Sequence, residues 1–200
     1  MTNTAIPSDA APMLGDHLAL NLLNTEARQD GATVDYWRDG EGVLRWLAQH
    51  GVVPPPGAPA LDPGKLLAQA TALRTLARRL IAARRNGDAL DKGDIDALNG
   101  HLHAYLSAPS LERDADGVPV LARVTRAEPL AALLGPVAQA LAQLLAEGDF
   151  GLVKQCEHPD CILWFYDRTK AHKRRWCSMS TCGNRHKAAQ FRLKAGAAKV

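Results

Sequence analysis

The spacing of apolar residues predicts helices through most of the N-terminal part of the chain. The clearest stripe runs from Lys65 to Gly87, where leucines and alanines recur three and four positions apart. Two shorter helices are predicted within residues 17–50, and Asp39 is placed to cap the second of them. A further helix is predicted from about Asp94 to Ser107.

Three further features stand out in the N-terminal part of the chain. Residues 53–64 are rich in proline and glycine and predict a connector without a helix. Around residues 111–124, an Asp116-Gly117 turn signal followed by β-branched residues favours a β-hairpin, and Pro119 places one strand at an edge. Pro136 fits the first turn of a last helix in this part of the chain.

The last fifty residues follow a different pattern. The apolar run ILWFY, residues 162–166, favours a β-strand, and Trp176 is expected on a return strand beside it. The residues after Cys182 favour a helix, with Phe191 packing on the rest of this segment. The expected fold class is mainly α. Residues 1–150 are expected to form a multihelical domain with one small hairpin, and residues 151–200 a small ββα-like module.

All four cysteines lie in this second module, within 27 residues, as two pairs of the form Cys-x4-Cys separated by 15 residues. Two such pairs can close a tetrahedral four-thiolate zinc site. A disulfide fits poorly, because nothing else in the chain indicates an oxidising compartment. Free thiols or another metal are the remaining interpretations. The predicted cofactor is therefore Zn²⁺, and its predicted ligands are Cys156, Cys161, Cys177 and Cys182.

A structural metal also answers an energetic need of this module. Between the two cysteine pairs, the bulky apolar residues are only Trp176 and those of the ILWFY run, too few to offset an ordering entropy of roughly 1 kcal/mol or more per residue. A structural zinc contributes on the order of 10 kcal/mol or more to folding. The sequence therefore predicts a module that folds only with its metal.

Charge divides the chain in the same place as the cysteines do. From Lys154 to Val200 there are eleven Lys and Arg against three acids, a net of +8, whereas the remaining 13 basic and 18 acidic residues give −5. A basic tail on an acidic body favours an anionic polymer as partner. A solvated terminus, or cations that serve the zinc thiolates, are the alternatives. The candidate nucleic-acid-binding residues are Lys173, Arg174, Arg175, Arg185, Lys187 and Arg192.

The residues from Cys156 to Arg192 closely resemble the CGNR zinc finger, whose name is the tetrapeptide Cys182-Gly183-Asn184-Arg185. One departure is Thr169-Lys170, where the family more often has Ser-Arg. The preceding residues are similar to the helical ABATE domain, through HLALNLLNTEA, DYW and VLRWLAQHGVV. This resemblance implies a stress-induced bacterial transcription regulator, with zinc on the four cysteines and DNA as its partner.

No catalytic constellation is visible in the first 150 residues. His101 and His103 are two positions apart on a predicted helix and cannot chelate one metal, and His17 is best explained as part of a helix start. A four-thiolate zinc has no open position for water, so we expect no enzyme. The helical domain is expected to dimerise or to sense a small-molecule effector. The alternative to DNA binding is a protein-interaction or RNA-binding module.

The sequence also favours a cytoplasmic location. The first thirteen residues lack the basic start and apolar run of a signal peptide. The most apolar stretch, LAALLGPVAQALAQLLA, is interrupted by Gly135 and Pro136, and we expect it not to span a membrane.

Overall fold

A computed structural model describes residues 10–29, 31–54 and 58–197. The first nine residues and part of the predicted connector, residues 55–57, lie outside the described residues. The chain forms two compact units, one from the described residues of Met1–Tyr36 and Asp149–Val200 and the other from Trp37–Gly148. We call them unit 1 and unit 2. The expected fold class is confirmed, since helices dominate and every sheet is a two-stranded antiparallel hairpin.

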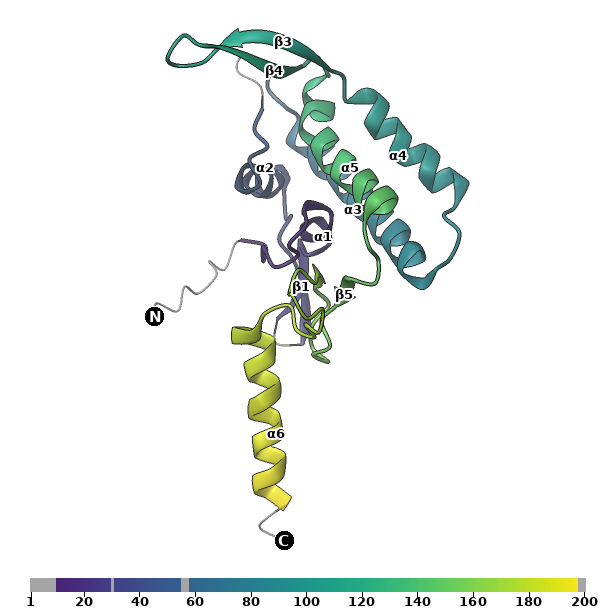
Figure 1. The fold of residues 1–200 in the computed structure, drawn as a ribbon, viewed down its shortest axis with the longest axis vertical. Coiled ribbons are helices and arrows are strands. Elements are labelled where there is room, and N and C mark those ends of the chain that lie inside the picture. The colour runs from purple at the N-terminus through teal and green to yellow at the C-terminus, as the bar shows by residue number, and fades with distance from the viewer. Residues whose placement is uncertain (1–9, 30, 55–57, 198–200) are drawn as a thin grey trace. The chain divides into compact units, whose positions relative to one another are not determined.

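Unit 2 is a helical body. Helix α3 contacts α2, α4 and α5, and α4 also packs on α5; Figure 1 shows α3, α4 and α5 lying side by side. Buried leucines such as Leu66, Leu73 and Leu80 line α3, as the apolar stripe predicts. The elements of unit 2 are α2 (Gly40–Gln49), α3 (Pro63–Asn86), α4 (Lys92–Ala104), β3 (Ser107–Arg113), β4 (Pro119–Thr125) and α5 (Pro129–Glu147).

The ends of these helices follow the expected local chemistry. The Asp39 side chain accepts a hydrogen bond of 2.8 Å from the backbone N–H of Gly42 and caps α2, as predicted. Gly87 ends α3 in the left-handed conformation, at φ 79°. The predicted hairpin is confirmed, because β3 and β4 pair with Leu111 opposite Leu121.

The predicted position of Pro136 in a first helical turn is wrong. Pro129 begins α5, and Pro136 lies inside the helix, where its missing N–H cannot bond to the carbonyl of Ala132. At the neighbouring Gly135 the Tyr105 ring lies so close that an added Cβ would be 2.1 Å from it. A side chain at position 135 would therefore displace Tyr105, and the glycine lets the ring pack against the helix next to the proline.

By length and composition alone, α5 could cross a membrane, although the sequence analysis expected its interruptions to prevent this. A core helix of a soluble protein passes the same test, and here Leu133, Val137 and Leu141 of α5 are fully buried. The helix is therefore accounted for as the core helix of unit 2.

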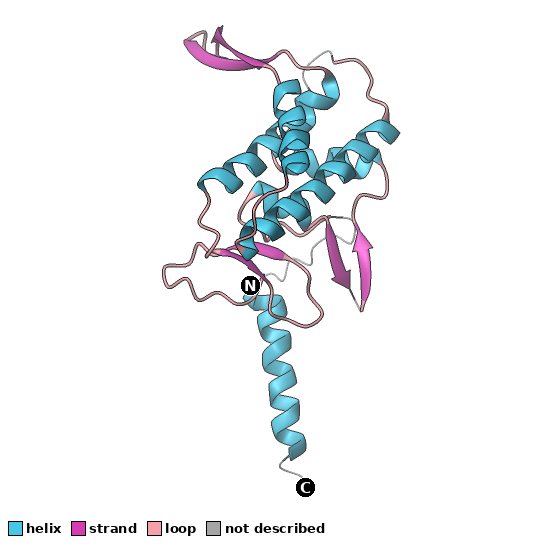
Figure 2. Ribbon diagram, turned by 90° about the vertical axis from the view of Figure 1, so that its right-hand side faces the viewer, coloured by secondary structure: helices cyan, strands magenta, loops and turns pink. Residues whose placement is uncertain are grey.

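Unit 1 combines the start and the end of the chain. The first segment holds α1 and a hairpin that the helical prediction for residues 17–50 missed, and the last segment holds a second hairpin and the terminal helix (Figure 2). In the second hairpin Lys154 pairs opposite Phe165. The elements of unit 1 are α1 (Leu18–Leu23), β1 (Glu26–Gln29), β2 (Ala32–Asp35), β5 (Val153–Gln155), β6 (Trp164–Tyr166), η1 (Met179–Gly183) and α6 (Asn184–Ala197).

Two predictions about the last module are corrected here. The return strand expected at Trp176 is wrong, because β6 pairs with β5, and residues 173–178 are irregular. The packing expected for Phe191 is also wrong, because its side chain is 74% exposed. The reason is that α6 contacts the rest of unit 1 mainly at its start, next to η1, and then extends away from it (Figures 1 and 2).

Candidate metal centre and basic surface

The four cysteines come together from two turns of unit 1. Cys156 and Cys161 lie in the turn between β5 and β6, where the Cys156 N–H donates to the Leu163 carbonyl at 2.9 Å. Cys177 lies two residues before η1, and Cys182 lies within η1, just before α6 begins. The Glu157 N–H donates to the Arg175 carbonyl at 3.0 Å and joins the two turns. All four Sγ atoms consequently lie within 4.8 Å of one another.

The sulfur positions fit a tetrahedral zinc ion. With Zn–S bonds of about 2.3 Å, the sulfurs of a regular tetrahedron are about 3.8 Å apart. The Sγ of Cys177 lies 3.7 Å from that of Cys161 and 3.6 Å from that of Cys182. A disulfide needs about 2.05 Å, so these cysteines are placed as metal ligands and not as bridges. Three of them are buried and Cys161 is half-buried, as in a closed structural site.

The four thiols lie too close together to ionise independently of one another. Hydrogen bonds with the Cys161, Cys177 and Cys182 side chains lower the pKa of Cys156. Hydrogen bonding to Cys156 and the other cluster thiols, together with burial, raises the pKa of Cys177. Four thiolates this close cannot all form without a compensating charge, which a bound metal cation would supply. The backbone N–H of Cys177 also donates to Cys156 Sγ at 3.4 Å, as is typical of zinc-ligating turns.

A buried carboxylate shapes the loop that leads to the second pair of cysteines. Asp167 is fully buried, and its Oδ2 accepts hydrogen bonds from Lys154 Nζ at 2.7 Å and from the Arg174 N–H at 2.9 Å. Its Oδ1 accepts from Thr169 Oγ1 at 2.6 Å and from the Thr169 N–H at 3.1 Å. Burial alone would raise the pKa of Asp167, but these donors outweigh it and hold the pKa well below its usual range.

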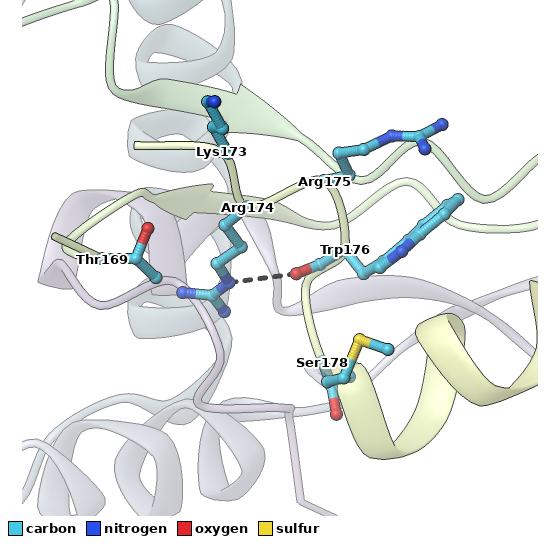
Figure 3. A pocket seen from close by; sticks show the side chains of 7 residues that line it. Thr169, Lys173, Arg174, Arg175, Trp176 and Ser178 are labelled. Atoms are coloured by element: carbon cyan, nitrogen blue, oxygen red, sulfur yellow. Dashed lines mark hydrogen bonds between the residues drawn. The ribbon is translucent and has the colours of Figure 1, made fainter. Parts of the chain in front are cut away.

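The Arg174 guanidinium is engaged inside unit 1. It donates to the carbonyls of Trp176 at 3.0 Å and Cys177 at 2.6 Å, forms an ion pair with Asp16, and lies 4.3 Å from the centre of the Phe165 ring. Figure 3 shows the guanidinium pointing toward the Trp176 carbonyl. These contacts assign Arg174 a structural role beside the metal centre.

Lys173 and Arg175, in contrast, are exposed. They line a pocket of about 540 Å³ together with Thr169, Trp176 and Ser178 (Figure 3). The Arg175 side chain pairs with Glu157 at 2.6 Å and lies 5.0 Å from the centre of the Trp176 ring. This pocket places two exposed cations and two hydroxyls beside an aromatic ring, and cations and hydroxyls are groups that bind anionic oxygens.

The other three candidate residues, Arg185, Lys187 and Arg192, lie exposed along α6. No aspartate or glutamate is present in this helix. Because α6 begins two residues after Cys182, the metal centre fixes the start of this basic helix. Of the six predicted residues, five are thus exposed, and the sixth, Arg174, has its guanidinium group engaged inside unit 1.

Two family models match the chain. One covers residues 16–148 and is that of ABATE, described as "Putative stress-induced transcription regulator". The chain belongs to the ABATE family. The second model, the CGNR zinc finger, covers residues 153–195. The order of the two matches confirms the resemblance seen in the sequence, and the four clustered cysteines lie in the CGNR match. No curated protein matches the chain.

The start of the ABATE match is part of the metal-centre unit. The Asn24 side chain accepts a hydrogen bond of 2.8 Å from the Trp164 N–H and donates one of 2.9 Å to the Trp164 carbonyl. The Tyr166 N–H donates to the Gly15 carbonyl at 2.8 Å. Sequence analysis missed these contacts, because 140 positions separate Asn24 from Trp164 and no local signal connects them. The compact units therefore divide the chain differently from the predicted domains of residues 1–150 and 151–200.

Proposed function

We propose that this ABATE protein is a zinc-dependent DNA-binding transcription regulator, in which the CGNR module contacts DNA and unit 2 dimerises or senses a small-molecule effector. The observation that carries the proposal is α6. It is a 14-residue helix anchored at the metal centre, with exposed basic residues and no acidic ones. The same proposal includes a cytoplasmic location. It includes no catalysis, because four thiolates fill the zinc coordination sphere and leave no position for water.

The distribution of charge favours contacts with the phosphate backbone. Arg185 and Arg192 are seven positions apart and share one side of α6, whereas Lys187 and Lys194 occupy nearly the opposite side. Such a helix lacks a single face for reading base edges. Its cations neutralise phosphates and release counterions, which gives affinity with a steep dependence on salt.

The test is a titration of the zinc-loaded chain with duplex DNA across a range of salt concentrations. We expect binding that weakens with salt and is lost on chelation. The variant Arg185→Ala/Lys187→Ala/Arg192→Ala should make the negative slope of log K against log[salt] shallower by about 2.7. The matched control, Arg38→Ala/Arg45→Ala/Arg113→Ala, removes the same charge from exposed positions of unit 2 and should leave the slope unchanged. Absence of duplex binding at low salt, with zinc present, would refute the proposal.

A second candidate, protein binding, is favoured by the apolar side chains on the same helix. Phe191 is 74% exposed and Leu193 is 67% exposed, so α6 could insert into an apolar groove of a partner protein. The variant Phe191→Ala/Leu193→Ala separates the two functions. A loss of co-purifying proteins with unchanged DNA affinity would favour the protein-binding role, and competition by single-stranded RNA would instead favour RNA.

A further inference from the structure

A groove of unit 1 lies along the side of α6 that carries Arg185 and Arg192. Its volume is about 550 Å³. Ala188 and Ala189 lie between the two arginines at helical spacing, so they belong to the same side. The opposite wall comes from two other segments, the β1–β2 hairpin with Arg28 and Gly31, and the first cysteine turn with residues 158–160.

The groove is basic. Three guanidinium groups line it, from Arg28, Arg185 and Arg192, against the single carboxylate of Asp160. Within the part of the chain that the structure describes, no ion pair engages Arg185 or Arg192. Arg28 donates one hydrogen bond of 3.0 Å to the Gly31 carbonyl, which holds the side chain at the hairpin and leaves its other donors available.

A further donor comes from His158. Its Nδ1 accepts a hydrogen bond of 3.2 Å from the Asp160 N–H, so Nε2 is the ring nitrogen that remains to donate. The donors of the groove are guanidinium and imidazole N–H groups, which bind anionic oxygens. They come from three separate segments of the chain.

The shape of the groove favours a polymer over a small molecule. Drug-sized ligands are normally buried over most of their surface. Here the arginines, Gly31, Pro159 and Ala188 are all exposed, so the groove is open along α6. The short alanine side chains let a backbone approach the helix closely. No Phe, Tyr or Trp side chain lines the groove, so it offers no such platform for unpaired bases.

We propose that this groove holds the phosphate backbone of duplex DNA, and that Arg28, from the first hairpin of the ABATE segment, is a phosphate-binding residue. This inference rests on the proposed function and adds to it. The DNA-binding surface then comes from both family segments, because Arg28 lies within the ABATE match and Arg185 and Arg192 lie within the CGNR match.

The experiment compares the zinc-loaded full chain with its Arg28→Ala, Arg28→Lys and Arg38→Ala variants, in duplex DNA titrations from low to moderate salt. Loss of one phosphate contact should weaken binding about fivefold at about 0.15 M salt. It should also make the negative slope of log K against log[salt] shallower by about 0.9. Arg28→Lys should retain most of the affinity, because a lysine still neutralises a phosphate. Arg38→Ala removes an exposed arginine of unit 2 and should bind like the wild type. Zinc content and melting temperature should be equal in all four proteins.

The outcomes separate this inference from the proposed function. If the wild-type chain binds no duplex DNA, the proposed function itself fails. If the wild type binds and Arg185→Ala/Arg192→Ala weakens binding, but Arg28→Ala has no more effect than Arg38→Ala, the groove is not the phosphate site and the proposed function stands. An Arg28→Ala effect seen with single-stranded RNA but not with duplex DNA would also overturn the inference.

Discussion

Burying a carboxylate costs free energy unless its oxygens accept hydrogen bonds, and Asp167 accepts four. Two come from Thr169, just after β6, and two come from Lys154 and the Arg174 N–H, so one residue fixes the loop that places Cys177. This role of Asp167 was not predictable from local sequence, because it depends on donors 13 positions before it and 7 positions after it.

We therefore expect Asp167→Asn to destabilise unit 1 by about 3 kcal/mol at pH 7, because it leaves the Lys154 ammonium without its counter-charge and places an amide N–H₂ against donors. Urea unfolding of the zinc-loaded protein measures the change. Since the pKa of Asp167 is lowered in the folded state, the difference between wild type and variant should be full above the unfolded pKa of about 4 and disappear as pH falls through the lowered value. Asp160→Asn, at an exposed site, is the control. Equal stability of Asp167→Asn and wild type at pH 7 would contradict this account.

The adjacent residues Arg174 and Arg175 should differ in role, with Arg174 supporting stability and Arg175 supporting DNA binding. Arg174 forms a fork of hydrogen bonds that lysine cannot reproduce, so Arg174→Lys should lower the free energy of unfolding by about 2 kcal/mol. Arg175 forms one exposed ion pair, so Arg175→Ala should change stability by less than about 0.5 kcal/mol and weaken DNA binding several-fold. Thermal unfolding and DNA titration of both variants test this. Arg174→Lys with wild-type stability would show that the internal contacts are dispensable.

These two residues also show what a sequence can predict about this site. The cysteines and the exposed cations were predictable, because ligand spacing and charge are local properties. The internal role of Arg174 was not, because its partner Asp16 lies 158 positions away. A basic residue in a basic segment looks the same whether it faces solvent or a distant carboxylate.

At the scale of elements, α3 was predicted well because a long helix with one buried face repeats its signal over many turns. The two four-residue strands β1 and β2 were not, because so few residues carry no detectable period. The irregular segment at Trp176 was mistaken for a strand, because its aromatic residue packs on His186, with ring centres 4.7 Å apart, and not across a sheet.

Asn24 provides a test of how the first segment supports β6. Its fully buried amide replaces a neighbouring strand by bonding both to the N–H and to the carbonyl of Trp164. Asn24→Ala removes both of these buried hydrogen bonds and should cost about 2 kcal/mol of unfolding free energy, measured by urea denaturation with zinc bound. Asn86→Ala, at an exposed helix end, should cost less than about 0.5 kcal/mol. If both variants lose the same amount, the bridge has no special role.

For the whole molecule, family boundaries and compact units do not coincide. The ABATE match starts at residue 16, yet the described residues up to Tyr36 belong to the unit that holds the metal centre. A sequence comparison follows chain order, whereas folding follows contacts, and contacts such as that between Gly15 and Tyr166 span the chain. The metal should therefore stabilise residues far outside the CGNR match.

Removal of zinc tests this organisation. Unit 2 has its own core, with fully buried residues such as Leu66, Leu73 and Leu141, and does not contain the cysteines. Unit 1 buries Leu20, Leu22 and Phe165, but its strands are only three or four residues long, and metal binding contributes free energy to its folding. A chelator should thus unfold unit 1, including residues 14–29, and leave the helices of unit 2 intact. Hydrogen exchange of the full chain should show lost protection at Tyr166 and Asn24 and retained protection in α3 and α5, with recovery when Zn²⁺ is restored. Loss of protection throughout the chain would show a single cooperative unit, and unchanged protection at Asn24 would show that the N-terminal segment folds without the metal.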